Sequence, residues 1–146
     1  MKRLILAIGL ACGVASQSAC MKATTATTPA APNSPQTTVA LTVKTVADSA
    51  SACIDTVIQL RDVSKKITPA QATTIGNWCS FVATTDKQLG VILAKSEPWA
   101  DQKREMLVSL GTVTAPAVAA NIDPAAAGII AQIMTLVNQL KVQVAP

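Results

Sequence analysis

The sequence predicts an all-α fold, an up-down-up-down antiparallel four-helix bundle. Three observations support this prediction. Apolar residues recur at helical spacing in four successive segments, and no segment alternates apolar and polar residues as a strand would. The connections between these segments are short, two to four residues, so consecutive helices are expected to run in opposite directions.

The first helix is expected over residues 35–66. Ser34 is suited to cap it, and Pro35 fits the first helical position. Its apolar stripe alternates steps of four and three, which is a heptad seam: Val39, Val43, Val46, Ala50, Cys53, Val57, Leu60 and Ile67, with Ser64 in one slot. A helix of this length would span about 48 Å and outreach the later helices. Its exposed part is therefore a candidate for self-association with a second copy.

The second helix is expected over residues 69–95. Thr68 and Gln71 have the spacing of a capping box, with Pro69 at the first helical position. The predicted inner stripe consists of Ile75, Trp78, Val82, Leu89 and Ile92.

The third and fourth helices are expected over residues 98–120 and 124–144. Gly111 and Pro116 should kink or end the third helix early. Asp123 is a suitable cap for the fourth helix. The predicted inner residues are Trp99, Met106, Leu110, Val113 and Ala117 in the third helix, and Ala126, Ile130, Ile133, Val137, Leu140 and Val144 in the fourth.

The N-terminal segment has the pattern of a secretory signal peptide. Lys2 and Arg3 precede an apolar run over residues 4–11, and small residues follow it. The apolar run is shorter than the roughly 20 residues that a transmembrane helix needs. We therefore predict that residues 1–19 are a signal peptide that is removed on export.

Ser18, Ala19 and Cys20 resemble the end of a lipobox, the motif that precedes the acylated cysteine of bacterial lipoproteins. The resemblance covers residues 1–20 only and departs from the usual pattern at Gln17. It implies cleavage before Cys20 and attachment of lipid, including palmitate, to that cysteine. Because Met21 follows in place of Asp, the resemblance implies an outer-membrane lipoprotein facing the periplasm. A rival cut after Ser16 would release a soluble periplasmic or secreted protein.

Residues 20–34 are expected to be a lipid-anchored, flexible tether. The segment is rich in Thr, Ala and Pro and has no apolar period, so it cannot build a core. A disordered tether of this length would hold the bundle, residues 35–146, about 20 Å from its anchor.

The four cysteines favour both acylation and one disulfide. Cys12 would leave with the signal peptide and Cys20 would carry lipid. The remaining two, Cys53 and Cys79, lie at equal distances from a turn centred on Lys66, so they would face each other in an antiparallel hairpin. We predict that they pair in an oxidising periplasm; the alternative is two buried free thiols.

Composition argues against catalysis and nucleic-acid binding. The chain has no His and no Tyr, which removes the commonest general base and metal ligand. Removing Lys2 and Arg3 lowers the net charge from +4 to +2, and the basic residues are not clustered. We therefore expect no catalytic residues, no cofactor or metal site and no nucleic-acid partner.

Other polar groups have simpler interpretations. Asp48, Asp55 and Asp62 recur every seven residues at about 10 Å, too far apart to share a metal, and are expected on the outer face of the first helix. Asp101 and Glu105 are four residues apart among cationic neighbours, which indicates a surface charge cluster rather than an acid–base pair.

Trp99 is the better candidate for contact with a partner protein. Both Trp78 and Trp99 fall on core stripes, but Trp99 lies in the first turn of its helix and is expected to be partly exposed.

A membrane hairpin is the alternative for the C-terminal half. Residues 106–122 and 124–140 are uncharged, but each has only 17 residues and several polar side chains, which is marginal for spanning. The leading prediction is a small, non-catalytic envelope lipoprotein that acts by protein binding or structural support. The alternatives are a pore- or lysis-type membrane-active protein and a soluble secreted inhibitor or accessory factor of the kind that a phage could carry.

Overall fold

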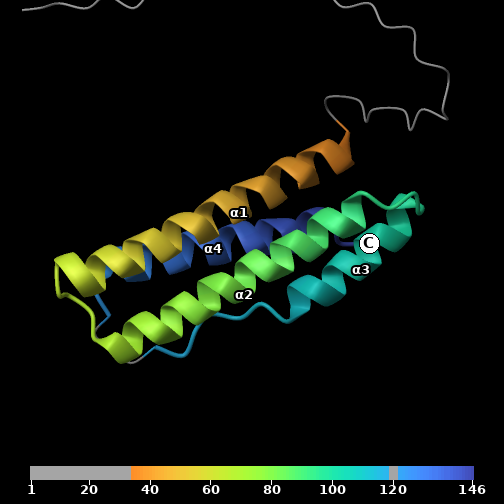
Figure 1. Cartoon of the computed structure of the whole chain (residues 1–146). Helices are drawn as coiled ribbons and strands as arrows, with labels where there is room; N and C mark the ends of the chain where they lie inside the picture. The colour runs from red at the N-terminus through yellow and green to blue at the C-terminus, as the bar shows by residue number, and fades with distance from the viewer. Residues whose placement is uncertain (1–33, 119–121) are drawn as a thin grey trace, which may run out of the picture.

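The computed structural model describes residues 34–118 and 122–146, and all regular structure in these ranges is helical (Figure 1). The elements are α1 (Pro35–Ile58), the π-helical turn η1 (Gln59–Val63), α2 (Pro69–Leu93), α3 (Trp99–Gly111) and α4 (Pro124–Gln143). The all-α prediction is confirmed. The predicted signal peptide, the predicted lipidation site Cys20 and almost all of the predicted tether lie outside the described residues.

The first two helices begin at the predicted caps. The Ser34 side chain accepts a hydrogen bond from the backbone N–H of Thr37 at 3.1 Å. At α2, the backbone N–H of Gln71 donates to the Thr68 hydroxyl at 3.2 Å, and the Gln71 side chain accepts from the Thr68 N–H at 2.9 Å. Both caps satisfy backbone donors that the first helical turn leaves without partners.

The later two helices start differently. Asp123 caps α4 through its carboxylate, which accepts from the backbone N–H of Ala125 at 2.9 Å. Pro98 precedes α3, and no side chain caps that helix. The start of α3 is instead fixed by packing, because Trp99 is half-buried against the core.

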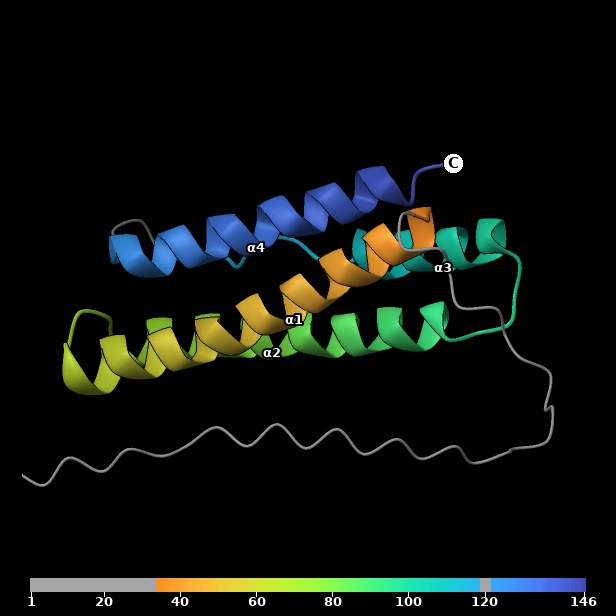
Figure 2. The same ribbon diagram turned by 90° about the horizontal axis from the view of Figure 1, so that it is seen from above.

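The core is formed by the apolar seams of all four helices. α1 packs against both α2 and α4, and lies between them in Figure 2, while α3 packs mainly on α2. All eight apolar residues of the predicted first seam are buried, as are the five predicted for the second helix. The predicted seams were wrong at Ser64 and Ala117, which are exposed, and incomplete at Ile130, which is half-buried.

The end of α1 departs from the predicted straight helix to residue 66. The α-helix ends at Ile58 and continues as η1, where the backbone N–H of Ser64 donates to the carbonyl of Gln59 at 3.0 Å. This wider turn breaks the heptad phase. Ser64 is consequently turned to solvent, and Lys65, with a positive φ of 52°, ends the helix.

The first helix is slightly shorter than the predicted 35–66, because it ends with η1 at Val63. α1 has 24 residues and continues into the 5 residues of η1, whereas α2 has 25, α3 has 13 and α4 has 20. Self-association through the first helix stays a prediction.

The third helix is much shorter than the predicted bounds of 98–120, and the prediction that Gly111 or Pro116 would kink or end it early is confirmed. α3 ends at Gly111, and residues 112–118 are not helical. Pro116 disfavours helical conformation at Ala115, so the helix cannot continue through that point. Non-helical chain instead runs lengthwise along the bundle towards the start of α4 (Figure 1). Val113 is buried, so this segment still contributes to the core.

Candidate functional site

The predicted cysteine pair is present between α1 and α2. Cys53 and Cys79 form a disulfide with a Cα–Cα distance of 6.3 Å, and both are fully buried. The bond encloses a sequence separation of 26 residues, for which a contribution of roughly 3 kcal/mol is typical. The two sulfurs are thereby consumed as a structural crosslink and are not available as thiol nucleophiles.

The two tryptophans have different environments. Trp78 is a core residue whose indole N–H donates to the backbone carbonyl of Thr114 at 2.6 Å. Trp99 is half-buried in the first turn of α3 and packs against the edge of the core. Trp99 thus has the partial exposure that a partner contact would need.

Asp48, Asp55 and Asp62 are exposed, as predicted for the outer face of the first helix. Asp48 forms an ion pair with Lys44 at 2.9 Å, and Asp62 accepts hydrogen bonds from Arg61 at 2.6 and 2.7 Å. The Arg61 hydrogen bonds lower the pKa of Asp62. Within the described ranges, no three acidic or cysteine side chains are grouped so that they could hold a metal ion.

Asp101 and Glu105 bind cations rather than each other. Asp101 pairs with Arg104 at 3.2 Å, and Glu105 accepts from Lys95 of the α2–α3 connection at 2.5 Å. The hydrogen bond to Glu105 raises the pKa of Lys95. This arrangement is a charge network that joins the end of α2 to α3.

Four buried polar residues were not predicted from the sequence, namely Ser49, Thr85, Asp86 and Gln102, and the last two bear on the candidate sites. Gln102 is 2% exposed, and its Nε2 donates to the carbonyls of Lys95 at 2.7 Å and Glu97 at 3.3 Å, which closes the α2–α3 turn. Asp86 is 8% exposed, and burial, with a smaller contribution from Asp48, raises its pKa to about 6. Steps of four and three residues from Ile75 reach position 86. This spacing indicates that Asp86 is buried, and it was the one sequence feature that could have predicted so.

A groove lies between α3 and the C-terminal end of α4. It has a volume of about 320 Å³, and its lining is mostly apolar with two cations: Ala100, Lys103, Arg104, Leu107, Val144 and Pro146. Lys103 Nζ donates to the carbonyl of Ala145 at 2.9 Å, which holds the C-terminal segment against α3. An apolar floor with a cationic rim suits an apolar side chain flanked by an acidic group.

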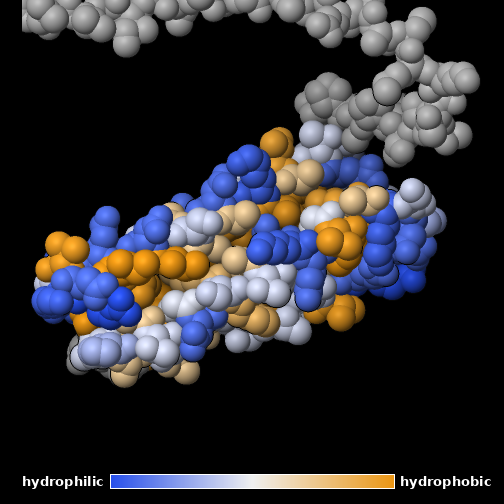
Figure 3. All heavy atoms as spheres, in the orientation of Figure 1, coloured by the Kyte–Doolittle hydropathy of each residue, from blue (hydrophilic) through white to orange (hydrophobic). Residues whose placement is uncertain are grey.

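A second hollow, about 400 Å³, lies between α2 and α3. Its lining consists of Thr84, Lys87, Gln88, Val91, Ile92, Lys95 and Ser109. Val91 is 65% exposed there. On the face shown in Figure 3, hydrophobic groups alternate with hydrophilic ones over the bundle.

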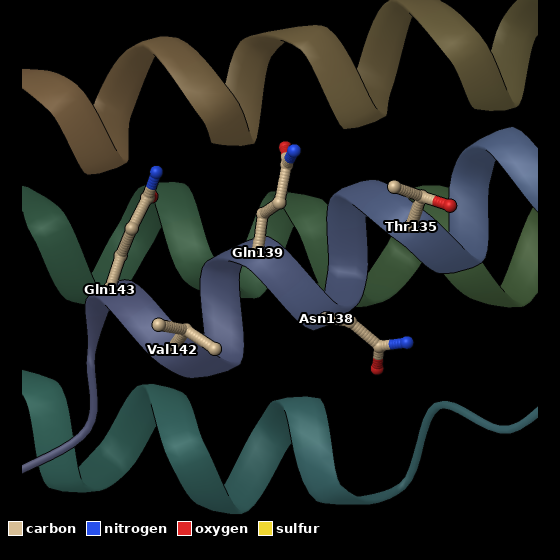
Figure 4. A pocket seen from close by; sticks show the side chains of 5 residues that line it. All are labelled: Thr135, Asn138, Gln139, Val142 and Gln143. Atoms are coloured by element: carbon tan, nitrogen blue, oxygen red, sulfur yellow. The ribbon is translucent and has the colours of Figure 1, made fainter.

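The outer face of α4 carries a broad, uncharged hollow of about 580 Å³. Thr135, Asn138, Gln139, Val142 and Gln143 line it. In Figure 4, Thr135, Gln139 and Gln143 lie on the side of α4 towards α1, whereas Asn138 and Val142 point the other way. Its lining offers three amides and one hydroxyl, which can bind a partner by hydrogen bonds.

The first half of the predicted membrane hairpin is not one continuous helix in the described part of the chain. α3 ends at Gly111, and residues 112–118 are not helical. Among the described helices, α4 alone is long and apolar enough to cross a bilayer. Only 22% of its most apolar window is buried inside the bundle.

Comparisons with known proteins found no relative of this chain. No protein-family model matches the chain, and no curated protein or solved structure matches it.

Proposed function

We propose that this chain is a small exported lipoprotein of the bacterial cell envelope. It acts by binding a protein or by structural support, without catalysing a reaction. In this proposal Cys20 carries the lipid, residues 20–34 form the tether, and the bundle faces the periplasm from the outer membrane.

The single observation that carries the proposal is the Cys53–Cys79 disulfide in the core. Persistent disulfides belong to oxidising compartments, which agrees with export directed by residues 1–19. Once Cys12 has left with the signal peptide, this pairing leaves Cys20 as the one cysteine available for acylation.

The topology proposed for the bundle is up-down-up-down, with α3 and residues 112–118 together forming the third leg. In Figures 1 and 2, the start of α1 and the end of α4 lie at the same end of the molecule. A tether attached to Ser34 would therefore place this end nearest the membrane, at about 20 Å.

The partner surface that we favour is the groove between α3 and the end of α4. It combines apolar depth with Arg104, and half-buried Trp99 begins the same helix. Trp and Arg are enriched among the residues that dominate protein interfaces. The groove lies at the end of the bundle that the tether would hold close to other envelope proteins.

Labelling with radioactive palmitate tests the anchor. We expect the full-length chain to be labelled and Cys20→Ser to lose the label, while Cys12→Ser, whose cysteine leaves with the signal peptide, keeps it. The intact mass should then correspond to a chain starting at Cys20 plus lipid. An unlipidated chain that starts at Gln17 would overturn the proposal in favour of a soluble secreted factor.

Membrane activity through α4 is the second candidate function. It is favoured by the length, composition and low burial of that helix. Leakage of dye from liposomes separates the two functions: the binding protein predicts none. Leakage that is abolished by Ile130→Lys on α4 and retained by Ala52→Lys on α1 would favour membrane activity instead.

A further inference from the structure

Asp86 occupies a position in the α1–α2 interface that a carboxylate rarely takes. On α2 the residues Ile75, Cys79, Val82, Asp86 and Leu89 follow steps of four and three, so Asp86 continues the buried seam. Its Oδ1 is inaccessible to solvent and has no hydrogen-bond partner among the described residues. Burial of one carboxylate oxygen without a partner favours the neutral, protonated form over the ionised one.

The surrounding elements supply no cation to Asp86. From α1, Asp48 contributes a negative charge, and its own ion pair engages Lys44. α3 buries the uncharged Gln102, and the one charged residue of α4, Lys141, donates to the Val113 carbonyl at 3.5 Å.

The neighbouring hydroxyl on α2 is also engaged. Thr85 is buried beside Asp86, but its Oγ1 donates to the carbonyl of Phe81 at 3.1 Å, one turn back on the same helix. The hydroxyl proton is therefore not directed at the carboxylate. Ionisation of Asp86 would leave a negative charge in the seam that only water could solvate.

We propose that Asp86 is a proton-dependent switch that loosens one half of the α1–α2 hairpin when it ionises. The Cys53–Cys79 disulfide lies one heptad before Asp86 on α2 and fixes the other half covalently. The half beyond the disulfide, residues 39–50 of α1 and 82–93 of α2, is held by packing and can separate to admit water. This inference is independent of lipid attachment.

The direction of the effect follows from the raised pKa. Folded Asp86 has a pKa of about 6 against 3.8 for an ordinary Asp, so the folded chain binds more protons than the unfolded chain between these values. Stability is consequently highest below about pH 4 as far as this group is concerned, falls as the pH rises, and reaches its lower level above about pH 6. Mild acid tightens the hairpin and neutral pH loosens it.

Hydrogen exchange resolved along the chain tests the switch. The mature protein is compared with Asp86→Asn at each pH, so that the chemical exchange rate cancels in the ratio. In residues 39–50 and 82–93 we expect the wild type to exchange within about threefold of the variant at pH 4. At pH 7.5 it should exchange faster by up to about a hundredfold, because the pKa differs by about two units.

Two controls make the result specific. Residues 53–57 and 72–79, next to the disulfide, should show a ratio near one at both pH values, and Asp55→Asn on the exposed face of α1 should match the wild type throughout. Asp86→Leu should give the same result as Asp86→Asn. It serves as the reference variant if Asp86→Asn folds poorly. A ratio that does not change with pH, or one that is equal in all segments, would overturn the proposal.

Discussion

At the scale of single residues, Trp78 links two distant parts of the chain through one polar atom. Its ring packs in the core while its indole N–H donates to the carbonyl of Thr114 at 2.6 Å. The acceptor, the carbonyl of Thr114, belongs to the non-helical segment after α3. It is therefore not engaged in a helical hydrogen bond and can accept from the indole. This contact holds residues 112–118 against α2.

Replacing Trp78 with Phe tests that contact. The variant keeps an aromatic ring in the core but loses the donor, so the Thr114 carbonyl has to find water or remain unpaired. We expect a loss of about 1–3 kcal/mol in the free energy of unfolding, measured by urea denaturation. Trp99→Phe is the matched control and should cost less, because Trp99 is half-buried at the edge of the core. Equal losses would mean that ring size, not the hydrogen bond, matters.

The sequence predicted buried residues well where they were apolar and in phase. Val39, Cys53 and Leu60 are buried as the heptad required, because an amphipathic helix can satisfy its seam in only one orientation. Asp86 was missed because polarity argued for exposure while its spacing argued for burial. At Ser64 the spacing failed, since a π-helical turn that no local pattern announces had changed the phase.

At the scale of elements, helix starts were predictable from local caps, and helix ends were predictable where the sequence carries a breaking residue. Ser34, Thr68 and Asp123 cap the first turns with their own side chains, so the signal is local. The early end of α3 at Gly111 agrees with the prediction that Gly111 and Pro116 would kink or end this helix, although the expected bound of 120 was too long. The path of the chain after α3 was not predictable, because the bond from the Trp78 indole to Thr114 joins parts far apart in sequence.

Thr68→Ala measures how much the capping box at the start of α2 contributes to stability. The substitution removes the oxygen that accepts from the Gln71 N–H and breaks the reciprocal capping box. We expect about 1 kcal/mol lower stability by thermal or urea unfolding. Thr74→Ala, an exposed threonine within the same helix, should leave stability within about 0.5 kcal/mol of the wild type. If both variants behave alike, the cap contributes nothing measurable.

At the scale of the whole molecule, the disulfide was predictable because it depends only on hairpin register. Residues equidistant from a turn meet in any antiparallel pair, and Cys53 and Cys79 do so. The grooves were not predictable. The one beside α3 needs the last residues of the chain to return against Lys103, which is a contact between parts far apart in sequence.

Removing the disulfide should lower the stability of the whole bundle. The double variant Cys53→Ala/Cys79→Ala is expected to lose roughly 3 kcal/mol in the free energy of unfolding. Dithiothreitol should produce a comparable loss in the wild type and no change in the double variant. A wild type that is insensitive to the reductant under conditions that break the bond would show that packing alone holds α1 and α2.

The position of the crosslink also decides what a protease can achieve. The exposed basic residues Lys65 and Lys66 connect η1 to α2, and Lys65 has left-handed backbone geometry, so within the bundle trypsin should cleave this connection before the helices. The resulting fragments would remain joined through Cys53 and Cys79 and migrate as one species on a non-reducing gel, separating into two when the gel is reduced. The backbone at that end is thus dispensable for holding the molecule together, which makes it a site for inserting an epitope or opening the chain.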